Sequence, residues 1–210
     1  MKKLILPLLL LVAIGMLAAV ESDPSNIVGY VKYPLYVGQN TIALPMVQTY
    51  AQASEVGNAI TGCNKVSKYN GATQQWVAAS KTPFGTWNGN FAVEIGMPLL
   101  INTTTAGNFY SIGALSDDLR IPPFTLYVGQ NLIMVPLNKS ALNMAGLVGN
   151  DIPGCNKVSK YNGATQQWVP ASKTPFGTWN GNFATTIGMP LLINTTTAGT
   201  WPVPYPKFSK

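Results

Sequence analysis

The residue types that perform most enzyme chemistry are sparse in this sequence. Its 210 residues include no histidine, so Ser-His-Asp and Cys-His arrangements cannot be built from this chain. The acidic residues are Glu21, Asp23, Glu55, Glu94, Asp117, Asp118 and Asp151. A glycosidase needs two carboxylates that flank its substrate, and the adjacent pair Asp117-Asp118 falls in a predicted linker. The sequence therefore predicts a protein that is not an enzyme and holds no cofactor.

The two cysteines, Cys63 and Cys155, suggest structural rather than catalytic chemistry. They form no Cys-x-x-Cys or Cys/His pattern, which argues against a zinc site. An even number of cysteines in an exported protein favours a disulfide. Three arrangements stay open: a bond within the chain, which requires halves that face each other about a pseudo-twofold axis, a bond to a neighbouring subunit, or two buried free thiols.

Two identical stretches rich in aromatic and amide side chains are candidates for a sugar-stacking platform. Their residues are Trp87, Asn88 and Asn90 in the first stretch and Trp179, Asn180 and Asn182 in the second. The alternative interpretation is that the tryptophans fill two small cores.

Three asparagines begin Asn-x-Ser/Thr sequons and are predicted glycosylation sites: Asn102, Asn138 and Asn194. Short turns formed by Asn and Thr explain these sequences equally well.

The candidate residues occur in pairs because the chain contains an internal duplication. Residues 63–107 recur as residues 155–199, with three differences in 45 positions. The differences are Ala78/Pro170, Val93/Thr185 and Glu94/Thr186. This spacing predicts two domains, at 22–115 and 127–210, joined by a linker at 116–126. Low charge (10%), 20 glycines, 16 prolines and frequent β-branched and aromatic residues predict an all-β fold of two tandem small β-sandwich or barrel-like domains.

Several elements are predicted inside each copy. The Asn70-Gly71 dipeptide is typical of a short hairpin turn between strands at 65–69 and 73–77, and Asn162-Gly163 repeats it. Leu99-Leu100-Ile101 is an apolar core strand. The helix candidates lie at 50–60 and 141–152, and each is limited to one or two turns because glycine interrupts it.

The N-terminus predicts export. Residues 1–19 carry Lys2-Lys3, an apolar run and small residues at its end, which is typical of a signal peptide. The apolar run is at the short limit for a membrane-spanning helix, so an uncleaved anchor remains an alternative, and this segment is the only predicted contact with a membrane. The net charge of +6 is scattered without a basic run, which argues against nucleic-acid binding.

The start of each repeat has a recognisable pattern. Val28-Gly29-Tyr30-Val31 is followed by Gly38-Gln39-Asn40-Thr41-Ile42-Ala43-Leu44-Pro45, then by Trp76, and by Gly96 before an apolar strand. This order resembles uncharacterised secreted prokaryotic proteins with tandem β repeats of the G-x-N-x-I-x-x-P kind. The resemblance implies export and a repeated β fold, and it implies no activity.

These observations predict a structural protein of the cell surface or extracellular matrix, which assembles head to tail with copies of itself into a filament. Ile27, Val28, Tyr30 and Val31 would form a donor strand, since the proline-broken tail after Thr200 is expected to leave an edge open. The alternative is that the N-terminal strand folds back onto its own domain and the tail caps the second. The rival function is a secreted bivalent module for glycan binding or adhesion.

Overall fold

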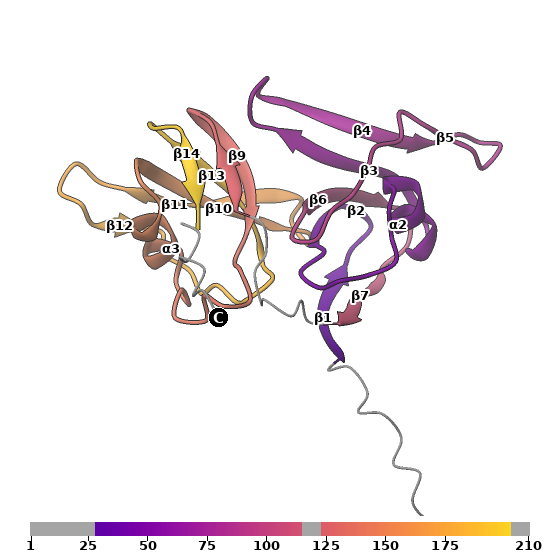
Figure 1. The fold of residues 1–210 in the computed structure, drawn as a ribbon, viewed down its shortest axis with the longest axis horizontal. Coiled ribbons are helices and arrows are strands. Elements are labelled where there is room, and N and C mark those ends of the chain that lie inside the picture. The colour runs from indigo at the N-terminus through magenta and orange to yellow at the C-terminus, as the bar shows by residue number, and fades with distance from the viewer. Residues whose placement is uncertain (1–27, 115–122, 203–210) are drawn as a thin grey trace, which may run out of the picture.

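The chain folds as two similar halves, seen side by side in Figure 1. The structure is a computed structural model, and it describes residues 28–114 and 123–202. We call residues 28–114 unit 1 and residues 123–202 unit 2. The described chain is mostly β, with two short helices. The predicted signal peptide and Ile27 lie outside the described residues.

Unit 1 is built on a five-stranded antiparallel sheet with one covering helix. The sheet order is β2 (Gly38–Ala43), β6 (Pro98–Thr103), β3 (Cys63–Asn70), β4 (Gln75–Lys81) and β5 (Trp87–Asn88). Helix α2 (Ala53–Ala59) connects β2 to β3, and a separate two-stranded ribbon pairs β1 (Val28–Leu35) with β7 (Gly107–Ala114).

Unit 2 repeats this plan. Its sheet order is β9 (Gly129–Met134), β13 (Pro190–Thr195), β10 (Cys155–Asn162), β11 (Gln167–Lys173) and β12 (Trp179–Asn180). Helix α3 (Ala145–Asp151) matches α2, and the ribbon pairs β8 (Phe124–Leu126) with β14 (Gly199–Trp201). Even the register shift after Cys63 recurs after Cys155. The predicted duplication and both short helices are therefore confirmed.

Both predicted hairpins are present, and their loops are longer than predicted. Asn70 pairs with Gln75, so four residues form the loop and β4 begins later than predicted. The Asn70 side-chain oxygen accepts hydrogen bonds from the N–H groups of Ala72 and Thr73, which is an Asx turn. The left-handed residue is Gln74, with φ of 56°, rather than Gly71. The predicted hairpin is therefore present, but its loop is longer than predicted because the Asn70 side chain closes it over four residues.

Both ends of the described chain are paired within the chain. Strand β1 pairs with β7 along all eight residues, from Val28 opposite Ala114 to Leu35 opposite Gly107. Phe124–Leu126, which fall inside the predicted linker, form β8 and pair with Gly199–Trp201. The structure thus shows the fold-back alternative for the N-terminal strand.

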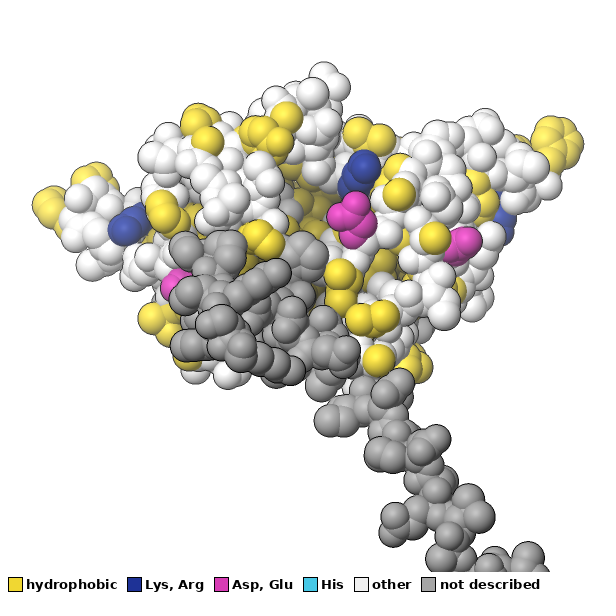
Figure 2. All heavy atoms as spheres, in the orientation of Figure 1, with side chains coloured by type: hydrophobic (Ala, Val, Ile, Leu, Met, Phe, Trp, Pro, Cys, Tyr) yellow, Lys and Arg dark blue, Asp and Glu magenta, His cyan; other side chains and the backbone are white. Residues whose placement is uncertain are grey.

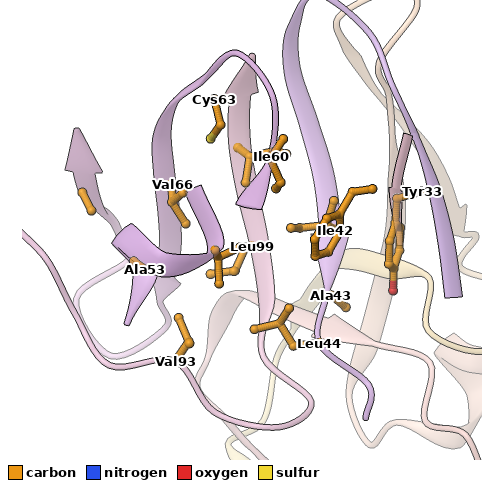
Figure 3. Packing of buried hydrophobic residues seen from close by; sticks show 14 of the residues in the cluster. Tyr33, Ile42, Ala43, Leu44, Ala53, Ile60, Cys63, Val66, Val93 and Leu99 are labelled. Atoms are coloured by element: carbon orange, nitrogen blue, oxygen red, sulfur yellow. The ribbon is translucent and has the colours of Figure 1, made fainter. Parts of the chain in front are cut away.

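Each unit has a core between its sheet, helix and ribbon, and the core of unit 1 also includes Met134 from unit 2. In unit 1, the core side chains labelled in Figure 3 include Val66 and Leu99 beside the helix and Ile42 on a neighbouring strand, and all three are fully buried. Burial of such a side chain contributes about 1.5–3 kcal/mol. Val158, Leu191 and Ile133 occupy the equivalent places in unit 2. A stacked aromatic pair joins the strands of each ribbon, Tyr33 with Phe109 in unit 1 and Phe124 with Trp201 in unit 2.

The two units are joined by a hydrogen-bonded seam. The Gln166 side-chain oxygen accepts from the Gln39 N–H at 2.6 Å, and its amide group donates to the Gln39 carbonyl at 3.0 Å. The Tyr161 hydroxyl adds a contact to the Gln39 side-chain oxygen at 3.2 Å. The hairpin tip of unit 2 therefore binds the start of β2 in unit 1.

The same contacts occur in the opposite direction. The Gln74 side chain accepts from the Gln130 N–H at 2.7 Å and donates to the Gln130 carbonyl at 2.9 Å. The Tyr69 hydroxyl lies 3.3 Å from the Gln130 side-chain oxygen. A reciprocal contact of this kind is what a twofold interface between two equal subunits produces. The duplicated chain is thus arranged as a fused pseudo-dimer.

Removing one glutamine should weaken the seam measurably. Gln166→Ala deletes two side-chain bonds to the Gln39 backbone, and we expect a loss of about 1–3 kcal/mol in the free energy of unfolding. Gln167→Ala is the matched control, because this neighbouring side chain is exposed and makes no seam contact. Urea unfolding measures both variants. Equal unfolding midpoints for Gln166→Ala and Gln167→Ala would contradict a stabilising role of the seam.

Candidate functional site

The predicted sugar platform is occupied by packing contacts. The Trp87 indole N–H donates to the Asn58 side chain at 3.0 Å, and its ring lies so close to α2 that a Cβ on Gly57 would overlap it. Trp179 makes the same contacts with Asn150 and Gly149 in unit 2. Both tryptophans are partly buried against their cores, which supports the core interpretation.

Asparagine side chains near these tryptophans bind the N-terminal ends of the two helices. The Asn90 side chain accepts from the Ser54 N–H at 3.0 Å and donates to the Ser54 hydroxyl at 2.9 Å. Asn182 accepts from the Gly146 N–H at 2.9 Å. These bonds satisfy N–H groups that a helix leaves unpaired at its first turn. Asn88 and Asn180 lie exposed in the short edge strands β5 and β12.

The two cysteines are free thiols in separate cores. Cys63 belongs to the core of unit 1 and Cys155 to that of unit 2, and both are 4% exposed. Each thiol donates to a backbone carbonyl two residues away, at 3.5 Å for Cys63 and 3.4 Å for Cys155. Desolvation raises the pKa of both thiols to about 11. Of the three predicted arrangements, the structure displays two buried free thiols.

The sequon asparagines lie in two kinds of place. Asn102 and Asn194 are half-buried in β6 and β13, where each side chain donates to a neighbouring asparagine. Asn138 is exposed in the turn that follows β9. Asn138 is therefore the most accessible of the three predicted glycosylation sites.

The acidic residues of the described chain are dispersed. Glu55 accepts from the backbone at the start of α2, and Asp151 binds Lys139 at 3.2 Å and the Trp201 indole at 2.8 Å. Residues 28–114 and 123–202 contain no group of three or more potential metal ligands. Within the same ranges, neither helix is long and apolar enough to cross a membrane.

Two of the cavities between the units lie on sides of the seam that the pseudo-twofold axis relates. Groove 1 is a cavity of about 450 Å³, and groove 2 is one of about 200 Å³. The residues that line groove 1 include Lys32, Tyr36, Thr41, Lys160, Tyr161 and Thr186. Groove 2 includes Lys68, Tyr69, Glu94, Pro123, Phe124 and Leu132.

Corresponding positions explain why the grooves differ. Thr186 in groove 1 corresponds to Glu94 in groove 2, and Thr41 corresponds to Leu132. Groove 1 therefore has smaller side chains at both places and lacks a carboxylate among its lining residues.

Sequence reasoning missed the seam glutamines and both grooves. The only signal was the repetition of Gly-Gln-Asn at 38–40 and 129–131 and of Gln-Gln at 74–75 and 166–167. Such repetition follows from the duplication itself, so it does not reveal that these segments contact each other.

Comparison of the chain with protein-family models, curated proteins and solved structures finds no match.

Thiol labelling tests the state of the cysteines. We expect both thiols to resist a soluble maleimide in the native protein at pH 8, because they are buried and their pKa lies far above this pH. Both should react once the protein is unfolded without reductant. Failure to react in the unfolded, oxidised protein would reveal a disulfide, and a non-reducing gel would then separate a bond within the chain from a bond between chains.

Proposed function

We propose that this chain is an exported structural protein of the cell surface that assembles with copies of itself through two identical apolar tips. The observation that carries the proposal is the exposure of Phe84 and Phe176, which are 94% and 93% accessible to solvent. Aromatic side chains are common anchors of protein interfaces, and full burial of one contributes about 1.5–3 kcal/mol.

Each phenylalanine is held on a rigid loop. In unit 1, the Thr82 N–H donates to the Thr86 carbonyl at 2.7 Å, and the Gly85 N–H donates to the Thr82 carbonyl at 3.0 Å. The two threonine hydroxyls lie 2.7 Å apart. Unit 2 repeats these bonds around Phe176. A preformed loop loses little conformational entropy on binding, which favours its use as an anchor.

The tips lie far apart. The loops that join β4 to β5 and β11 to β12 form the two far ends of the molecule in Figure 1. Figure 2, in the same orientation, shows hydrophobic side chains at both ends. A molecule with an identical anchor at each end can contact two neighbours at once, which is the requirement for chain growth.

Head-to-tail strand lending is a second route to the same function. It would now require a domain swap, because β1 is paired with β7 of its own chain and β14 with β8. Two predicted donor residues, Val28 and Val31, lie within that pairing, and Tyr30 is exposed on the ribbon. The tips need no such rearrangement, so they are the favoured route.

Glycan binding is the other candidate function. The residues first proposed for it, Trp87 and Trp179 with their neighbouring asparagines, are largely used for packing and helix capping. Groove 1 is therefore the surface that we favour for a glycan over these tryptophans.

Removing both tips should abolish self-assembly. We expect the wild-type protein to form larger species in sedimentation velocity as concentration rises, and Phe84→Ala/Phe176→Ala to stay monomeric with an unchanged melting temperature. Leu147→Ala is the matched control, since this side chain is also apolar and 44% exposed but lies on α3. It should assemble normally.

A wild-type protein that is monomeric at every concentration would refute the proposal. Assembly by the double variant would refute the tips as the route. Cysteines introduced at the facing positions Tyr30 and Ile112 then identify strand lending, because a swapped β1 gives a reducible ladder and a folded-back β1 gives a bridged monomer.

A further inference from the structure

We propose that groove 1 is a binding site for a carboxylated saccharide, such as a uronic acid unit of an acidic polysaccharide. This inference is independent of the apolar tips. It rests on a comparison of groove 1 with groove 2. An exact duplication would make the two grooves alike, and the sequence differences between the copies make them differ.

The first difference between the two grooves is their volume. Small-molecule sites in proteins usually have volumes of about 300–1,000 Å³. Groove 1, at about 450 Å³, falls within this range, and groove 2, at about 200 Å³, falls below it. The difference follows the side chains, because Thr41 and Thr186 are smaller than Leu132 and Glu94. Groove 1 therefore offers the larger space for a sugar ring and its neighbours.

The charges of the lining residues also distinguish groove 1 from groove 2. Lys32 and Lys160 line groove 1 without any acidic residue, while groove 2 has Glu94 together with Lys68 and has Pro123 in the place of Lys32. The Lys160 ammonium lies 4.8 Å from the centre of the Phe183 ring, and the described residues give it no carboxylate partner. Groove 1 is thus electrostatically suited to an anion.

One of the sequence differences between the two copies lies in the grooves. The duplicated block differs at three positions, and one of them, Glu94/Thr186, lines the two grooves. Its neighbour Val93/Thr185 is buried next to it, and the Thr185 hydroxyl donates to the Leu142 carbonyl at 2.6 Å. The change of chemistry between the copies therefore falls on the wall of the larger groove.

The walls of groove 1 favour a saccharide over a peptide. Tyr36 is packed against Gly163, where a Cβ would lie 2.7 Å from its ring, and the Tyr161 hydroxyl is held by Gln39 and Gln166. Two fixed aromatic rings offer apolar faces for the C–H groups of a sugar, and Thr41 and Thr186 offer hydroxyls for its polar edge. A carboxylate on that sugar would pair with Lys160.

Calorimetric titration of the purified protein at low ionic strength tests the site. The probes are trigalacturonate, a mannuronate tetramer and a hyaluronan tetrasaccharide. We expect at least one of them to bind with one site per chain. Removal of the ligand charge by methyl esterification should weaken that binding about tenfold or more.

Variants of groove 1 should weaken binding, and the corresponding variant of groove 2 should not. Thr186→Glu installs the residue of groove 2 at an exposed position, and it should weaken binding about tenfold or more, as should Lys160→Gln. Glu94→Thr is the matched control in groove 2 and should leave binding unchanged. Phe84→Ala/Phe176→Ala should also bind normally, which separates this proposal from assembly through the tips.

Several outcomes would overturn the proposal. These are no binding of any of the three saccharides, two equal sites per chain, equal binding of the esterified ligand, or normal binding by Thr186→Glu with an unchanged melting temperature. Binding of hexaglutamate in the absence of saccharide binding would assign the groove to acidic peptides instead.

Discussion

The amide side chain of Gln166 takes the place of a further strand on the open edge of β2. Its oxygen and its nitrogen pair with the N–H and the carbonyl of Gln39, as the backbone of a neighbouring strand would. Gln74 does the same for β9 at Gln130. An uncovered sheet edge invites uncontrolled pairing with other chains, so these two contacts both join the units and protect their edges.

Most other features of the molecule follow from this reciprocal seam. It places the hairpin tips of β3–β4 and β10–β11 at the centre, and this sends the loops with Phe84 and Phe176 outward to the two ends. It also creates one groove on each side, between residues of both units. The duplication provides the symmetry, and a few later differences make the grooves unequal. Assembly at the ends and binding at the centre can therefore be served by one scaffold.

The sequence predicted the fold of the repeated units better than it predicted the interface between them. The duplication, the β class and the two short helices could be predicted because they depend on local patterns within each copy. The loop after Asn70 was predicted too short, since an Asx turn competes with the Asn-Gly turn and both begin with the same dipeptide. The roles of Trp87 and Asn90 depend on α2, which is distant in sequence, so composition alone suggested a ligand platform.

Amide hydrogen exchange of Gln39 and Gln130 tests the central claim most directly. Each N–H lies on the outer edge of its sheet, and its hydrogen-bond acceptor comes from the other unit. A stable seam predicts that both amides exchange far more slowly than those of an unstructured chain and to a similar degree, since opening of the seam must precede their exchange. Exchange of both amides at the rate of an unstructured chain would show that the units are not joined in this way.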